Sequence, residues 1–164
     1  MLFEIALSGI TFLLNTFLGL FVFYRNTKSW TNRLFFALIG FINLYIVVNY
    51  FSLHPPEPTP ENQLFWIRVV MFVTSFIGPT LLLLTHTFPK DKIKLSIPKL
   101  MALSALCFTS ATASLLPYVF TGIEYPNGEP VPTPGPAIPI FFIDFAGLFV
   151  FSFVLLIYKY RKSI

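Results

Sequence analysis

The sequence predicts an all-α fold, a polytopic membrane bundle of five transmembrane helices. Only 11% of its 164 residues are charged, whereas about a quarter are charged in a typical soluble domain. Hydrophobic residues make up 55% of the chain and include 21 phenylalanines, more apolar surface than a soluble core of this size can hide. Five apolar runs are each about 20 residues long, enough for a helix to cross a hydrocarbon core of roughly 30 Å. We therefore expect one transmembrane domain over residues 1–164.

The five predicted spans are separated by short polar or proline-rich connections. They cover about residues 3–24, 34–53, 64–88, 100–120 and 138–158. The first span has no basic residue before it, so we expect an uncleaved helix rather than a signal peptide. The fourth span is the richest in serine and threonine, and we expect other helices to enclose it. Beyond it, Tyr-Pro-Asn-Gly at 125–128 predicts a tight turn and a small hairpin.

The distribution of charge predicts the orientation. All lysines and arginines except Arg68 fall in three groups, which follow the first, third and fifth spans. These are Arg25, Lys28 and Arg33; Lys90, Lys92, Lys94 and Lys99; and Lys159, Arg161 and Lys162. By the positive-inside rule that side is cytoplasmic, so the N-terminus lies outside and the C-terminus inside. Five acidic residues fall on the outer side: Glu4, Glu57, Glu61, Glu124 and Glu129. Because the basic residues form no single patch, we expect no nucleic-acid partner.

Polar residues within the spans give the candidate site. Arg68 lies about one turn below the outer surface on the third span, and Asp144 about two turns below it on the fifth. An ionisable residue inside a membrane is costly unless it is paired, so Arg68–Asp144 is the expected ion pair. Asn49 of the second span lies at similar depth. Two interpretations stay open: a structural pair that holds two helices together, or an outward-facing pocket for a small ligand, rimmed by Trp66 and Tyr50.

The third span contains Gly78-Pro79 near its middle. A proline inside a helix removes one backbone hydrogen bond and frees carbonyl groups in the preceding turn, here around Thr74 and Ser75. We therefore expect a kink at this point. The kink can serve as a hinge, or it can be a static feature of packing.

The sequence contains no recognisable catalytic constellation. It has no HExxH, no glycine-rich phosphate loop, no GxSxG and no CxxC. The two histidines, His54 and His86, are predicted on opposite sides of the membrane and cannot share a metal ion. The single cysteine, Cys107, excludes an intrachain disulfide. We expect no enzymatic activity, no cofactor and no metal.

Several weak motifs are spread over nearly the whole chain. They are NRLFFAL at 32–38, FWIRVVMFVTSFIGPTLLLLTHTFP at 65–89, and a Gly-Pro at 135–136 before an aromatic-rich last helix that ends in KYRKS. With them the chain resembles the seven-helix N-terminal membrane region of bacterial sensor histidine kinases. The resemblance implies a sensory role in a two-component system, a bacterial plasma-membrane location and a homodimer. It also implies two further helices and a kinase core, which this sequence lacks, so we expect a truncated piece or a five-helix relative.

The leading functional prediction is a membrane-embedded sensory input module without output domains. A small ligand or the lipid bilayer would shift the last helix, provided that the stimulus distinguishes two helix arrangements energetically. One alternative is a structural or assembly protein that partners a larger membrane complex, through the polar fourth span if its hydroxyl face is exposed. The other is a transporter fragment, although no inverted repeat and only one broken helix are evident.

Overall fold

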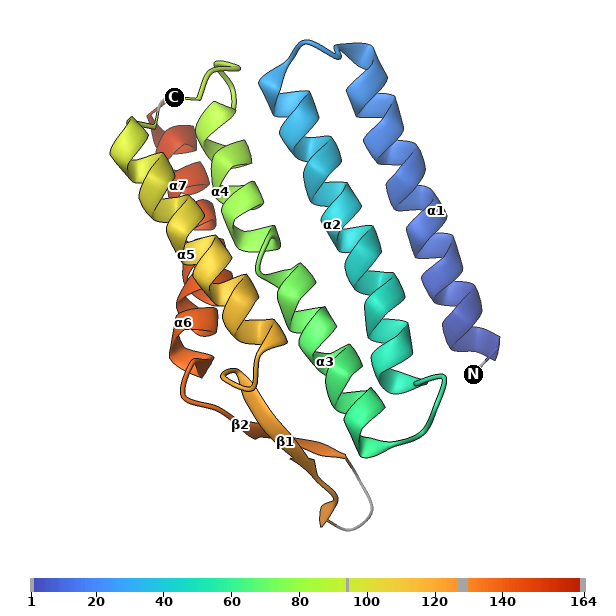
Figure 1. The fold of residues 1–164 in the computed structure, drawn as a ribbon. Helices are drawn as coiled ribbons and strands as arrows, with labels where there is room; N and C mark the ends of the chain where they lie inside the picture. The colour runs from blue at the N-terminus through green and yellow to red at the C-terminus, as the bar shows by residue number, and fades with distance from the viewer. Residues whose placement is uncertain (1, 94, 127–129, 163–164) are drawn as a thin grey trace.

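The computed structural model describes residues 2–93, 95–126 and 130–162 as a bundle of helices that run side by side (Figure 1). The elements in chain order are α1 (Leu2–Arg25), α2 (Trp30–Leu53), α3 (Pro60–Thr74), α4 (Ile77–Thr87), α5 (Ile97–Leu115), β1 (Phe120–Glu124), β2 (Val131–Pro134), α6 (Ile138–Phe142), the π-helical segment η2 (Ile143–Gly147) and α7 (Leu148–Arg161). Together α3 and α4 form one column, and α6, η2 and α7 form another.

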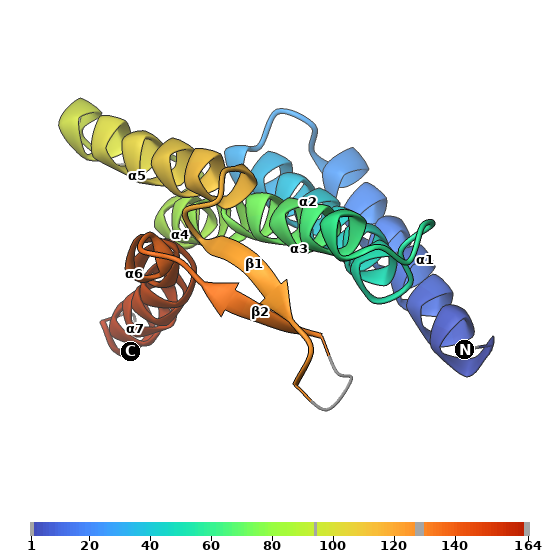
Figure 2. The same ribbon diagram turned by 60° about the horizontal axis from the view of Figure 1, so that its bottom comes forward.

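The α3–α4 column lies at the centre of the bundle. It contacts α2 on one side and α5, η2 and α7 on the other, whereas α1 packs on α2 (Figure 2). Helix caps fix where two of these columns begin: the hydroxyl of Ser29 accepts a hydrogen bond from the Asn32 amide, and that of Thr59 from the Asn62 amide. Pro60 follows Thr59 at the first helical position, where a missing N–H costs nothing.

Within the described residues, four columns are long and apolar enough to cross a membrane. They are Phe3–Arg25, Trp30–Leu53, Pro60–Thr87 and Ile138–Arg161. The side chains that are fully buried are mostly small and polar, among them Ser75, Ser110 and Ser114, while large apolar side chains such as Phe3 and Phe17 are more than two-thirds exposed. This inverted distribution suits a solvent of lipid. The chain is thus a multi-pass membrane protein, as its composition predicts.

The predicted fourth span was wrong in its bounds and in its surroundings. Helix α5 ends at Leu115 rather than at residue 120, because Pro117 cannot continue it and Phe120 already belongs to β1. The other helices do not enclose α5. Its buried face contains Cys107, Ser110, Ala111 and Ser114. Thr109 and Thr112 on the opposite face are exposed within the described chain, and so is Ser104 nearer the start of the helix.

An antiparallel hairpin of β1 and β2 closes the end of the bundle where α3 begins. It pairs Phe120 with Pro134 and Glu124 with Val131, and it contacts α3. The hydroxyl of Tyr125 donates to Gln63 at 3.2 Å. The hairpin predicted here is therefore present, although Asn127 and Gly128 of its predicted turn lie outside the described residues. Lys94, Glu129 and the last two residues of the chain also lie outside them.

Candidate functional site

The central column breaks between α3 and α4, at Ser75 and Phe76. Pro79 lacks the N–H that would bond to the carbonyl four residues earlier, which belongs to Ser75. The Cys107 thiol of α5 donates to this carbonyl at 3.5 Å instead. The irregularity predicted from Gly78-Pro79 thus falls one turn before the proline, where the predicted free carbonyls lie. Movement about this point, the hinge, stays a prediction.

Gly78 brings the backbones of α4 and η2 into direct contact. A Cβ atom at this position would lie 2.5 Å from the carbonyl oxygen of Asp144 and 3.3 Å from that of Phe145. No side chain fits at such a distance, so only glycine allows this approach. The break in one column therefore faces the π-helical segment of another. Single π turns inside α-helices occur often at functional sites.

Asp144 lies in this π segment and is fully buried. In the described part of the chain, neither of its carboxylate oxygens has a hydrogen-bond partner. The hydroxyl of Ser110 faces the carboxylate without reaching hydrogen-bond geometry, and Cys107 is near enough to interact electrostatically. A buried carboxylate without a donor is costly, because it has lost its water and gained nothing in return.

The hydroxyl groups around Ser110 are engaged in hydrogen bonds with one another and with backbone carbonyls. Ser75 donates its hydroxyl hydrogen to the Met71 carbonyl at 3.0 Å, so in the 3.2 Å contact between Ser75 and Ser110 the donor is Ser110. Ser114 donates to the Ser110 carbonyl at 2.8 Å. The Ser110 hydroxyl is therefore engaged with Ser75 rather than with Asp144.

Arg68 does not pair with Asp144, so the predicted ion pair was wrong in this structure. The Arg68 guanidinium donates to the carbonyl of Phe120, from Nη2 at 2.8 Å and from Nε at 3.2 Å. Pro134, which pairs with Phe120 in the hairpin, has no N–H to offer that carbonyl. Asp144 packs beside Gly78, ten residues after Arg68, which is roughly 15 Å further along the column at 1.5 Å per residue.

The other three predicted site residues lie near the end of α2 and the beginning of α3. Trp66 stacks on Phe51 at 4.7 Å between ring centroids, and Tyr50 stacks on His54 at 4.9 Å. Trp66 also packs against a core cluster that contains Val48. Asn49 is half-buried, and its backbone carbonyl accepts a hydrogen bond from Ser52. The structure therefore places these residues in packing contacts, and a ligand pocket formed by them stays a prediction.

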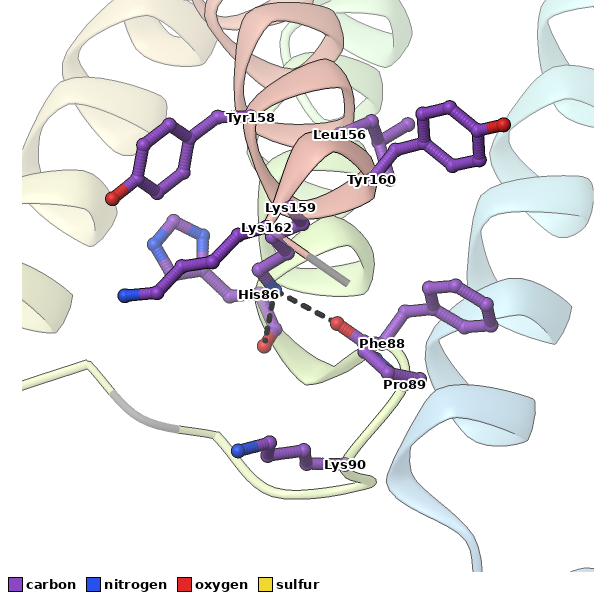
Figure 3. Close-up of a pocket in the computed structure, with 9 residues that line it drawn as sticks. All are labelled: His86, Phe88, Pro89, Lys90, Leu156, Tyr158, Lys159, Tyr160 and Lys162. Atoms are coloured by element: carbon purple, nitrogen blue, oxygen red, sulfur yellow. Dashed lines mark hydrogen bonds between the residues drawn. The ribbon is translucent and has the colours of Figure 1, made fainter. Parts of the chain in front are cut away.

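A feature that the sequence analysis missed lies at the opposite end of the bundle. Lys159 of α7 extends its ammonium group to the last carbonyls of α4, those of Thr85, His86 and Phe88, at 2.5, 3.1 and 2.8 Å. These carbonyls have no helical N–H to pair with, so a cation stabilises them. Figure 3 shows this contact at the edge of a cavity of about 680 Å³. In the sequence, Lys159 served only as one of the basic residues that indicate orientation.

Comparison with known proteins gives one match. No curated protein and no solved structure matches this chain. The model of the family described as the N-terminal 7TM region of histidine kinase matches residues 7–164, nearly the whole chain. A match of this extent agrees with the helical membrane bundle and with the resemblance seen in the motifs of the sequence. The chain therefore belongs to the family of N-terminal seven-transmembrane regions of histidine kinases.

Proposed function

We propose that this chain is the sensory input module of a histidine-kinase-type signalling protein in a bacterial plasma membrane. Family membership supports the general role. The observation that carries the proposal is the attachment of α7 to the central column at two points. At one point η2 rests on Gly78, and at the other Lys159 binds the end of α4. A change in the position of the α3–α4 column would therefore be transmitted to α7.

The orientation required by this role follows from charge. The basic end of the bundle lies in the cytoplasm by the positive-inside rule, so α7 runs from the membrane interior towards the cytoplasm. A kinase core acts on cytoplasmic partners, and α7 is the helix that leads towards it. As in other kinases of this type, a homodimer is the form in which such a module would work.

The π segment supplies a two-state element. A π turn contains one residue more than an α turn, so conversion of η2 to α-helix would turn α7 by as much as about 100°. A stimulus shifts such an equilibrium only if it binds the two arrangements differently. Gain or loss of a hydrogen bond at Asp144, in the first turn of η2, would distinguish them. The ligand or membrane property that acts on this centre is the module's stimulus.

Autophosphorylation tests the proposal. The reading frame beyond Ile164 is first determined, and the complete protein is purified in lipid nanodiscs. We expect Gly78→Ala to change the autophosphorylation rate several-fold, because it forces α4 and η2 apart. Gly9→Ala is the matched control, since a Cβ there meets no atom within 4 Å. A frame that ends without a kinase core, or equal rates in both variants, would refute the proposal.

One observation favours a second function, that of an assembly partner in a larger membrane complex. Three hydroxylated residues of α5 are exposed, Ser104, Thr109 and Thr112, and small hydroxylated residues mediate contacts between helices in membranes. Substitution of these three residues by leucine separates the two functions. If the variant loses a co-purifying membrane subunit but signals normally, the chain is an assembly partner. If its signalling changes without such a loss, the sensory function is supported.

A further inference from the structure

The cavity beside Lys159 opens at the end of the bundle where α4 and α7 finish. It is lined by His86 of α4, by Phe88, Pro89 and Lys90 of the connection that follows, and by Leu156, Tyr158, Lys159, Tyr160 and Lys162 at the end of the chain (Figure 3). Its volume of about 680 Å³ is that of a site for a small molecule. We call it the inner-end groove.

Charge in the inner-end groove has one sign. Lys90 and Lys162 enter it from two separate segments, and Figure 3 shows Lys162 beside His86 and Lys90 on the connection after α4. No acidic residue is among the described residues that line it. Asp91 follows Lys90 directly, but its carboxylate accepts hydrogen bonds from the Ser29 hydroxyl and the Thr31 amide, both at 2.8 Å. An anion is the complement of this groove.

The rest of the lining is apolar and aromatic. Phe88, Tyr158 and Tyr160 are 54%, 61% and 67% exposed in the chain, so their rings present large surfaces at the membrane boundary. Tyrosine rings are typical of this boundary, where one end of the ring meets lipid and the other meets headgroups. A soluble anion would make no use of such rings. A molecule with both an anionic group and acyl chains would use the lysines and the rings together.

We propose that the inner-end groove binds the phosphate headgroup of an anionic membrane phospholipid. Lys90 and Lys162 contact the phosphate, and the aromatic rings that line the groove contact the acyl chains. Basic pockets between helices on one side of a membrane are known to take such headgroups. Lys159 has a separate task in the same groove, because its ammonium binds the carbonyls of α4. This inference does not depend on the sensory function.

Native mass spectrometry of the purified chain tests the site with phosphatidylglycerol as the probe. We expect the wild type to retain bound phosphatidylglycerol and the double variant K90Q/K162Q to retain at least about tenfold less, since each lysine near a lipid surface adds to binding. The matched control is K28Q/K99Q, which removes two exposed lysines and the same charge from residues that do not line the groove. This control should bind like the wild type.

Three results would overturn the proposal. Equal losses in both double variants would mean that only diffuse surface charge attracts the lipid. Equal retention of phosphatidylcholine by the wild type would mean that the groove does not select an anion. Displacement of the lipid by inorganic phosphate at low concentration would identify a free phosphate as the ligand. The variant K90R/K162R, which keeps both charges, should restore binding and excludes loss of folding as the cause.

Discussion

The carboxyl group of Asp144 is fully buried and receives no hydrogen bond within the described chain. We therefore expect Asp144→Asn, which replaces it by a neutral group of the same shape, to leave the free energy of unfolding unchanged or to raise it, because the cost of burying an unpaired charge is removed. If Asp144 were half of a buried ion pair, its removal would cost about 3–5 kcal/mol. Denaturant unfolding in detergent measures the difference. The double variant with Arg68→Ala should show additive effects, because the two residues share no contact.

Lys159 gives a second prediction for a single residue. Its ammonium binds three carbonyl oxygens at the end of α4, so Lys159→Met, which keeps the aliphatic stem, is expected to destabilise the protein by about 1–3 kcal/mol. Lys99→Met is the control, since Lys99 is exposed on α5 and a surface substitution away from such contacts stays within about 0.5 kcal/mol. Thermal unfolding of both variants in one detergent makes the comparison. Equal melting temperatures would show that the capping contact adds no stability.

Asp91 predicts how stability responds to pH. The hydrogen bond from the Thr31 amide, with that from the Ser29 hydroxyl, holds the pKa of Asp91 below its ordinary value of 3.8. The charged form is thus favoured by folding. Its contribution is complete above pH 3.8 and is lost as the pH falls through the lower pKa of the folded state.

Asp91→Asn should weaken this fall in melting temperature at acidic pH. Asn also tolerates the left-handed backbone of Asp91, where φ is 52°. Parallel pH curves would contradict the assignment.

At the scale of elements, the sequence predicted what depends on local composition. The apolar runs predicted the long helices, and Pro79 predicted an irregular turn around Ser75, because a proline acts on the carbonyl four residues before it. What depends on tertiary contacts could not be predicted. The hairpin turns the Phe120 carbonyl towards Arg68, and no sequence pattern marks Asp144 as part of a π turn. The expected ion pair failed because depth was counted from the start of each span, whereas α6 begins further from the hairpin end of the bundle than α3 does (Figure 1).

The contact between α4 and η2 gives a prediction at the same scale. A methyl group at Gly78 would lie 2.5 Å from the Asp144 carbonyl oxygen. A backbone carbonyl cannot relieve this clash by changing rotamer, as a side chain can. We expect Gly78→Ala to cost about 1–3 kcal/mol through overpacking. Gly9→Ala should instead be neutral or stabilise α1 by up to about 1 kcal/mol, because alanine is the better helix former and space is open there. Equal effects of the two substitutions would mean that the helices separate freely.

For the whole molecule, apolar and polar surfaces are arranged as a membrane requires. Large apolar side chains cover the outside of α1 and α7, and small polar side chains from α3, α5 and η2 meet in the interior. Membrane helices associate through such close polar contacts, since lipid provides no hydrophobic drive to bring them together. The exposed hydroxyl face of α5 is the exception. Composition alone predicted that the protein lies in a membrane, but only the structure shows which face of each helix is buried.

Orientation in the membrane is the last prediction, and the chain is well suited to its test. The only cysteine, Cys107, is buried, so a cysteine added elsewhere can be labelled against a low background. We expect Glu57→Cys, in the α2–α3 connection, to react with a membrane-impermeant maleimide in intact bacterial cells. Lys28→Cys, in the basic α1–α2 turn, should react only after the cells are permeabilised, because the positive-inside rule places that turn in the cytoplasm. Both side chains are exposed, so access depends on the side of the membrane alone. The reverse pattern would place the end of α7 outside the cell, where it could not lead to a kinase core, and would overturn the proposed sensory function.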